Sequence, residues 1–502
     1  MRKSTLYISF LIIGTILCPS VRSQSFEVIK IAKECSESSL KKNLYYLASD
    51  EMEGRMMASH GDTLASLFVA GEFKKAGLTA PYHGNYFQSI SATRKSTKAY
   101  IMFGRKKYKM YDGWMVFPSG DISLKNIPVL FNTFTDLNEL SNYINHTDVN
   151  GKAITIWQPL MFQAFSGNID SIETTWKAKG IVALVWFGMG RVKTMTYYKE
   201  HDFIPQYKNE LLDPIFNPGD DSNGGLPEIS ILPERMNDLL DANQIKLNAD
   251  GSFRNSNQKP ELLKNELSIS VQTKLNEVHA PNVIGVLKDL DTTLPVIVLS
   301  AHHDHDGKKG NKIYYGAVDN ASGTTVIIEL ANMLNKAAMR GLKPKRSIVF
   351  ASFTGEERGE LGSSYYVNHP LYSMEKTYGV LNIDMMGRVD TFYSGKRSDS
   401  NYAYILVKDS LHNFRKSLYA ANDSLHELTL DRYYEDPKYT KRRLEGSDQF
   451  PFYIKGVPFI RIDCGFCKDY HQLTDTPDKI NYSLLKKQAQ LAFLTLWNMA
   501  NE

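Results

Sequence analysis

The chain contains few cysteines, no internal repeat, no low-complexity tract and no excess of one charge. Four cysteines occur in 502 residues, too few for a disulfide framework. Basic side chains exceed acidic ones by only four, so nothing indicates binding of nucleic acid or another polyanion. After the first two dozen residues, no apolar run is long enough to span a bilayer. These absences leave an ordinary globular protein.

The N-terminus has the pattern of a signal peptide. The basic residues Arg2 and Lys3 precede a short apolar core from Leu6 to Leu17, and small residues precede a cleavage point near Gln24. We therefore predict that residues 1–23 are removed and that the protein is exported, to the periplasm or outside the cell. The removed segment holds three basic side chains and no acidic one, so the net charge falls from +4 to +1.

The cysteines leave several interpretations open. Leu directly before Cys18 fits a lipidation site poorly, so no lipid anchor is expected there. Cleavage leaves Cys35, Cys464 and Cys467. An exported protein can form a Cys464–Cys467 disulfide, and buried or free thiols are equally compatible with the sequence. Cys464, Cys467 and His471 also have the spacing of part of a zinc knuckle, although no second cysteine pair completes it.

The length predicts two or three domains. Residues 24–95 carry apolar side chains at helical spacing and are predicted to be a helical part of the main domain. Residues 96–265 change to short β runs and loops, with a polar linker at Asn255–Pro260. Residues 266–502 have a regular pattern. We expect an inserted domain followed by the catalytic domain.

The inserted segment is predicted to be a smaller α/β domain. Ala153–Trp157 and Ile181–Phe187 have the composition of strands, and Ile172–Lys179 between them has that of a helix.

The catalytic segment alternates strands and helices. Helices are predicted over Asn320–Leu334, from Glu357 onward, and over Ser483–Met499. This alternation predicts an α/β fold, with a mostly parallel central sheet covered by helices on both faces. The predicted strands are Leu267–Val271, Asn282–Leu287, Val296–Ser300, Ser347–Phe353, Gly379–Ile383 and Val457–Ile462.

Metal-binding side chains follow these strands or begin the next helix. Sites in open α/β sheets form beyond the carboxyl ends of the strands, so we expect the side chains to meet there. Two histidines and three carboxylates suit two close Zn²⁺ ions bridged by a carboxylate and a water. Taken singly, each could be a surface group or a helix cap, but together they indicate metal-assisted hydrolysis. The predicted ligands are His302, Asp319, Glu357, Asp384 and His471.

Neighbouring residues suggest further roles. Asp319 has two oxygens and could bridge both metals, although it could also cap the following helix. Glu356 and Glu357 are adjacent, so their side chains diverge, and Glu356 is a candidate general base. Asp304 lies two residues from His302 and could orient its imidazole.

The remaining histidines of this segment, His303 and His305, are predicted to be structural or to lie at the rim of the site.

Six motifs of the second half resemble the co-catalytic zinc exopeptidases, the MH clan. That family includes bacterial secreted aminopeptidases, glutamate carboxypeptidase and glutaminyl cyclase. The resemblance covers residues 266–502; Glu53-Gly54-Arg55 is similar to the family's N-terminal helical region, and residues 96–265 resemble, more weakly, its protease-associated domain. The motifs are Ala301-His302-His303-Asp304-His305, Asp319-Asn320-Ala321-Ser322-Gly323, Gly355-Glu356-Glu357, Leu381-Asn382-Ile383-Asp384-Met385-Met386-Gly387, Gly446-Ser447-Asp448 and Tyr470-His471.

The resemblance implies a role for each matching residue. It implies two zinc ions per chain, with His302 and Asp384 on one, Glu357 and His471 on the other, and Asp319 between them. It makes Glu356 the general base, Asp304 the partner of His302, and Tyr470 a stabiliser of the oxyanion. It also implies a cis peptide bond at Asp319-Asn320. Gln449 departs from the family, which commonly has a histidine there.

The expected function is that of a secreted aminopeptidase acting on peptides. The alternatives are a carboxypeptidase or dipeptidase of the same fold, a glutaminyl cyclase, or a binding protein without activity. The large insert argues against a cyclase, and the complete ligand set argues against a binding protein. Mn²⁺ or Co²⁺ could replace zinc in such an oxygen-rich site.

Overall fold

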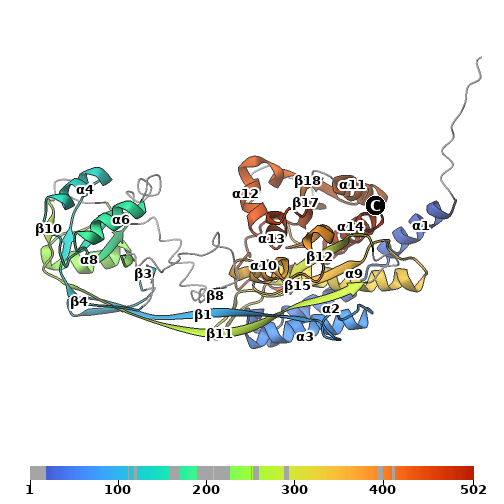
Figure 1. Cartoon of the computed structure of the whole chain (residues 1–502), viewed down its shortest axis with the longest axis horizontal. Coiled ribbons are helices and arrows are strands. Elements are labelled where there is room, and N and C mark those ends of the chain that lie inside the picture. The colour runs from blue at the N-terminus through green and yellow to red at the C-terminus, as the bar shows by residue number, and fades with distance from the viewer. Residues whose placement is uncertain are drawn as a thin grey trace, which may run out of the picture. The chain divides into compact units, whose positions relative to one another are not determined.

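The computed structural model describes residues 19–110, 112–117, 121–157, 169–188, 207–208, 226–249, 251–252, 259–287, 293–392, 400–409 and 413–502. Most of the predicted signal peptide and of the predicted linker lies outside these residues. The chain forms two compact units (Figure 1): unit 1 is Met1–Ile90 with Ala280–Glu502, and unit 2 is Ser91–His279. No described helix is long and apolar enough to cross a membrane.

Unit 1 is built on a large mixed sheet whose central strands are parallel. The strands lie in the order β18-β17-β19-β16-β12-β15-β11-β1. Neighbours from β19 to β15 run parallel, whereas β17 and β11 join this core antiparallel. The bounds are β1 (Phe87–Phe103), β11 (Leu267–Leu287), β12 (Val296–His302), β15 (Ile348–Phe353), β16 (Thr377–Ile383), β17 (Tyr402–Lys408), β18 (Thr429–Asp431) and β19 (Phe459–Asp463).

Helices cover both faces of this sheet, as predicted. Alternate side chains of β12 enter different cores: Ile297 and Leu299 pack with one group of helices, and Val296 and Val298 with the other. Every residue of β12 and β15 is buried, which explains their continuous apolar sequences. One face carries α1 (Pro19–Lys33), α2 (Glu37–Leu47), α3 (His60–Lys75), α9 (Ser322–Met339), α11 (Phe414–Leu425) and α14 (Tyr482–Asn501); the other carries α10 (Leu361–Asn368) and α13 (Gln449–Ile454).

Three of these predictions differ from the structure. The two strands predicted at 267–271 and 282–287 are one long strand, β11. Helical structure was predicted up to residue 95. The last helix of this part, α3, ends at Lys75, and strand β1 begins at Phe87. The helix predicted from Glu357 is also wrong. A 3₁₀ turn, η6 (Glu356–Arg358), comes first, and α10 begins only at Leu361.

The helical N-terminal part of the chain is hydrogen-bonded to the loop that follows β12. Arg55, in the turn η1 (Asp50–Arg55), is fully buried although it is charged. Its guanidinium donates four hydrogen bonds of 2.6 to 2.9 Å to main-chain carbonyl oxygens. Buried charge is tolerated when it is hydrogen-bonded in this way. The acceptors belong to Leu47, His303, Tyr315 and Gly316.

Unit 2 has its own sheet and its own cores. Its strands lie in the order β10-β5-β6-β7-β9-β3, and β5, β6, β7 and β9 are parallel. The strand–helix–strand order predicted around residues 153–187 is confirmed by β6, α6 and β7. The bounds are β3 (Trp114–Phe117), β5 (Val129–Phe131), β6 (Ala153–Trp157), β7 (Ala183–Phe187), β9 (Glu228–Ile231), β10 (Glu261–Leu262), α4 (Leu137–Asn145), α6 (Ile169–Ala178) and α8 (Pro233–Leu240).

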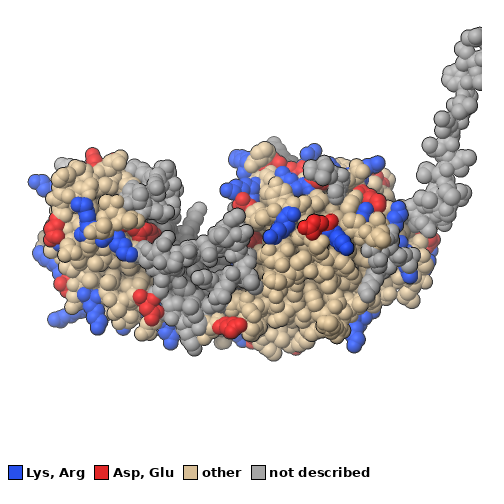
Figure 2. All heavy atoms as spheres, in the orientation of Figure 1, with Lys and Arg blue, Asp and Glu red and all other residues tan. Residues whose placement is uncertain are grey.

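Charged side chains are mixed on the visible surface. Figure 2 shows basic and acidic residues interspersed over the described part of this face of each unit. No continuous field of one sign appears among the described residues on that face.

Candidate metal centre

The structure brings all five predicted ligands together at the carboxyl end of the central sheet. His302 is the last residue of β12, and Asp384 directly follows β16. Glu357 lies in η6 after β15, and His471 lies in the loop after β19. Asp319 lies in the turn η5 (Ala317–Ala321) that precedes α9. Because the strands are adjacent and parallel, segments far apart in sequence deliver their side chains to one place.

The first site, as we call the set His302, Asp319 and Asp384, converges on the His302 Nε2 atom. That nitrogen lies 3.3 Å from Asp319 Oδ1 and 3.5 Å from Asp384 Oδ1. Glu356 approaches the same nitrogen, with Oε2 at 3.8 Å.

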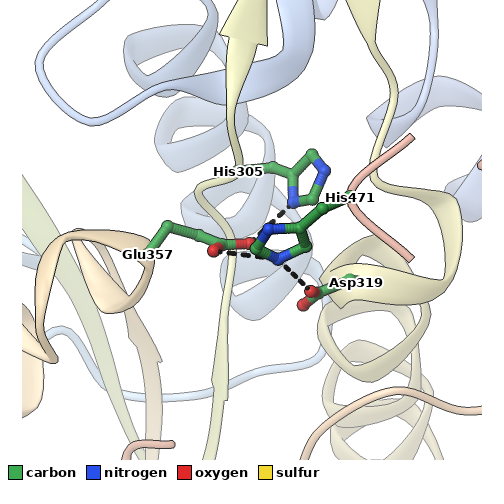
Figure 3. Close-up of side chains that lie close together, drawn as sticks. All are labelled: His305, Asp319, Glu357 and His471. Carbon is green, nitrogen blue, oxygen red and sulfur yellow. Dashed lines mark hydrogen bonds and ion pairs between the residues drawn. The ribbon is translucent and has the colours of Figure 1, made fainter. Parts of the chain in front are cut away.

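The second site, as we call the set Asp319, Glu357 and His471, converges on His471 Nε2. Asp319 Oδ2 lies 3.0 Å from it and Glu357 Oε2 lies 3.2 Å from it (Figure 3). Asp319 thus directs one oxygen to each histidine, the geometry needed to bridge two ions.

These distances fit metal ligands. Zn²⁺ holds nitrogen and oxygen at about 2.0 to 2.2 Å, so two ligands of a tetrahedral ion are separated by about 3.3 Å. His302 Nε2 and Asp384 Oδ1 are buried and have no hydrogen-bond partner among the described residues. Buried groups without partners are costly, and a cation between them would remove that cost. The donor set therefore fits two ions that share Asp319.

The backbone around Asp319 is held from two sides. The Asp319–Asn320 peptide bond is cis, as the resemblance implies. Asn320 Oδ1 accepts hydrogen bonds from the N–H groups of Gly323 at 2.8 Å and Met385 at 3.1 Å. The segment after β16 and the turn before α9 are thereby joined.

Asp475, which sequence reasoning missed, holds the other side. Its carboxylate accepts hydrogen bonds from the N–H groups of Val318 at 3.0 Å and Asp319 at 3.4 Å. Burial is the main cause that raises the pKa of Asp475 to about 6. The only signal in the sequence was an acidic residue four positions after His471.

Glu356, the candidate general base, lies beside the first site. Its main-chain N–H donates to Asp304 Oδ1 at 3.1 Å. Burial raises the pKa of Glu356 well above its usual value, and the carboxylates of Glu357 and Asp384 add to that rise, while His302 opposes it. Cations at the site would oppose it further.

Asp304 and Tyr470 each lie beside a candidate histidine ligand. Asp304 is fully buried, with Oδ1 3.5 Å and its carbonyl oxygen 3.3 Å from His302 Nδ1. The Tyr470 ring lies 4.0 Å from the His471 ring, centroid to centroid. Burial raises the pKa of Tyr470, so its hydroxyl remains a hydrogen-bond donor at neutral pH.

The histidines His303 and His305 are both fully buried, so a position at the rim is wrong for them. His303 turns away from the ligands: Nδ1 lies 3.0 Å from Ser352 Oγ and Nε2 lies 3.3 Å from Asp62 Oδ1. His305 turns toward Glu357, with Nδ1 2.7 Å from Oε1.

Arg461 was also missed, although β19 gave a signal. It is a basic residue inside the apolar strand sequence Phe-Ile-Arg-Ile-Asp. The guanidinium is buried, and Nη2 donates to Asp384 Oδ2 at 2.9 Å. This bond leaves Asp384 Oδ1 directed at His302.

Gln449, the departure from the family, has a structural role. Its side chain is fully buried, and Oε1 accepts a hydrogen bond from Asn382 at 2.8 Å. Its Nε2 donates to the carbonyl oxygens of Arg443 at 3.1 Å and Leu444 at 2.8 Å. It therefore supports β16, which ends at Ile383, directly before Asp384.

The three described cysteines are free and buried. The Cys464–Cys467 bridge is absent from this structure, and both thiols lie in the core of unit 1. His471 faces Asp319 and Glu357, which argues against a knuckle with these cysteines.

A buried carboxylate shared by two histidine–carboxylate sets, at the carboxyl edge of an α/β sheet, is an arrangement that suits a two-metal hydrolase. Residues 282–496 match the model of peptidase family M28. This match covers 215 of the 502 residues and confirms the resemblance of this region to zinc peptidases.

Curated relatives match over short regions. The aminopeptidase NAALADL1 of Rattus norvegicus is 30% identical over 122 residues, 24% of this chain and 15% of the relative. The protein named "Probable glutamate carboxypeptidase VP8" of Zea mays is 31% identical over 216 residues, 42% of this chain and 28% of the relative. The chain therefore spans less than a third of the length of these relatives.

Solved structures share the fold along nearly the whole chain. The aminopeptidase from Aneurinibacillus sp. strain AM-1 superimposes with a TM-score of 0.57 at 18% identity, covering 94% of this chain and 96% of that one. The zinc aminopeptidase BSAP from Bacillus subtilis gives a TM-score of 0.54 at 15% identity, covering 93% and 96%. At such identities the likeness shows the fold.

Proposed function

We propose that the chain is an exported, two-zinc aminopeptidase that removes residues from the N-termini of peptides. The observation that carries this proposal is the position of Asp319. One of its oxygens lies 3.3 Å from His302 Nε2 and the other 3.0 Å from His471 Nε2. A single carboxylate between two such sets is arranged for two ions rather than one.

His302 and Asp384 would hold one zinc, Glu357 and His471 the other, and Asp319 both. Bound zinc supplies a Lewis acid that activates a water and polarises the scissile carbonyl.

Glu356 would carry out the proton transfers. Its carboxylate lies beside the first site, with Oε2 3.8 Å from His302 Nε2, where it could reach a water held between the two sites. It would accept the proton of the attacking water and pass it to the leaving amine. Asp304 keeps the Glu356 loop in place through the main-chain hydrogen bond, and the Tyr470 hydroxyl would donate to the oxyanion.

The names of similar proteins favour an aminopeptidase. The relative from rat and both solved structures are named aminopeptidases. A carboxypeptidase is the second candidate, because the maize relative is named as one.

Unit 2 and the N-terminus complete the proposal. Unit 2 would be an inserted protease-associated-like domain, supported by its separate cores and its own mainly parallel sheet. Residues 1–23 would be a signal peptide, supported by their sequence.

Digestion of a mixed peptide set tests the function. The mature protein, with its metal content measured, would be incubated with the peptides and the products followed by mass spectrometry. Stepwise loss of N-terminal residues, abolished by chelation and restored by Zn²⁺, is expected. Loss from the C-terminus would indicate a carboxypeptidase, and loss of ammonia from N-terminal glutamine without cleavage would indicate a cyclase. No reaction by the metal-loaded protein would contradict the proposal.

A further inference from the structure

His305 and Asp306, which follow β12, each contact one ligand of the second site. His305 Nδ1 lies 2.7 Å from Glu357 Oε1 (Figure 3), and Asp306 Oδ2 lies 3.4 Å from His471 Nδ1. Neither contact involves His471 Nε2 or Glu357 Oε2, the atoms that approach each other in the second site. The two residues therefore lie behind the second site.

The contact between His305 and Glu357 is a hydrogen bond rather than a pair of metal ligands. Two ligands of one tetrahedral zinc lie about 3.3 Å apart, whereas this distance is 2.7 Å. The other oxygen of Glu357, Oε2, lies 3.2 Å from His471 Nε2. Glu357 thus accepts from His305 with one oxygen and offers the other to the metal.

The His305 ring is fixed in this orientation. It is fully buried, and the main-chain N–H of His305 donates to Arg55 O at 3.1 Å. A Cβ atom at Gly316 would lie 2.4 Å from His305 Cγ, so only glycine at this position leaves room for the ring.

Asp306 contacts His471 in a similar place but at a longer distance, as an ion pair of 3.4 Å. The carboxylate lies between two groups, since its Oδ1 is 3.5 Å from Arg358 Nη1 and its Oδ2 is 3.4 Å from His471 Nδ1. A carboxylate on Nδ1 fixes the tautomer that presents Nε2 to a metal and makes that nitrogen a stronger ligand.

We infer that His305 and Asp306 are positioning residues that set the metal affinity of the second site without changing that of the first. The inference rests on the proposed two-zinc function. Asp304 stands behind His302 of the first site. Three consecutive residues, Asp304-His305-Asp306, would then support both sites from one segment.

Zinc titration of variants tests the inference. Wild-type protein and variants would be dialysed against buffers of stepped free Zn²⁺, and bound zinc per chain measured at each step. The affinity of one site should fall about 10- to 100-fold in His305→Ala, as for other outer ligand partners, while the other site is unchanged. His305→Asn should restore most of the affinity, because its amide N–H can take the place of Nδ1–H.

His303→Asn is the matched control. His303 belongs to the same segment and is equally buried, but its ring contacts Ser352 and Asp62. Its zinc curve should match the wild type even if the metal-free protein unfolds at a lower temperature. Should His305→Ala fail to fold, Asp306→Asn gives the second test, with the same loss at one site expected.

Three results would overturn the inference: equal weakening of both sites in His305→Ala, an unchanged zinc curve, or no recovery in His305→Asn. The last would make His305 a direct ligand. A wild-type protein that never binds two zinc ions would instead contradict the proposed function.

Discussion

Arg461 Nη2 donates to Asp384 Oδ2 at 2.9 Å from within strand β19. Arg461→Met would leave the buried carboxylates of Asp384 and Asp463 without this guanidinium. Removing one member of a buried ion pair costs about 3 to 5 kcal/mol. We expect that loss in the free energy of unfolding of the metal-free protein, measured by urea denaturation. A loss below 1 kcal/mol would show that the carboxylates find other partners.

Glu356→Gln tests the general base. The amide keeps the size of the side chain but cannot accept the proton, so turnover should fall by about 10² to 10⁴-fold. Zinc content should stay at the wild-type value, because Glu356 is not among the proposed ligands. Full turnover in this variant would remove Glu356 from the role.

Asp319→Asn tests the bridge. The amide keeps one oxygen and replaces the other with a nitrogen that binds zinc poorly, so at least one ion loses a ligand. Since the proposed sites share this residue, we expect lower zinc affinity than in Asp384→Asn, in which only the first site changes. Comparable zinc curves for the two variants would mean that the carboxylate is not shared.

Two buried carboxylic acids, Glu360 and Asp448, should make the stability of the protein depend on pH. Burial is the main cause that raises the pKa of Glu360 from 4.5 to about 8 and that of Asp448 from 3.8 to about 7. At a pH between the ordinary and the raised pKa values of these acids, folding takes up protons. The free energy of unfolding therefore falls as pH rises from about 5 to about 8. Asp448→Asn should make this decline shallower in the metal-free protein, followed by urea unfolding at each pH. The exposed Asp423→Asn is the control, and equal slopes for all three proteins would contradict the assignment.

Gly54→Ala tests the fastening of the loop after β12. Gly54 has a φ of 72°, and a Cβ there would lie 2.3 Å from Gly307 O. Gly84 also has a positive φ, 86°, but no atom lies within 4 Å of its Cβ position. Gly84→Ala should cost about 1 kcal/mol of unfolding free energy and Gly54→Ala distinctly more, measured by thermal or urea unfolding. Equal costs would show that the loop can move away.

The sequence predicted the parts of the site that follow directly from a strand. Val296–Ser300 is an apolar run followed closely by a candidate ligand, so the place of this strand in the sheet and the position of His302 both follow from the local pattern. Asp475 and Arg461 could not be predicted in this way, because their partners Val318 and Asp384 are more than seventy residues away in the chain. The start of α10 was missed because Glu360 adopts a φ of 50°, which interrupts the helix. Tertiary packing determines this conformation, and the spacing of apolar residues does not reveal it.

Unit 2 enters and leaves unit 1 on strands that are neighbours in the sheet. Ser91 continues β1, Ala280 lies in β11, and the two strands are adjacent. Nearby, Ile284 N–H donates to Tyr86 O at 2.7 Å. A short turn could join these two points, so unit 1 would form one continuous chain even without unit 2. The strands that precede the candidate ligands, β12, β15, β16 and β19, all lie in unit 1, so gain or loss of unit 2 would leave their order unchanged.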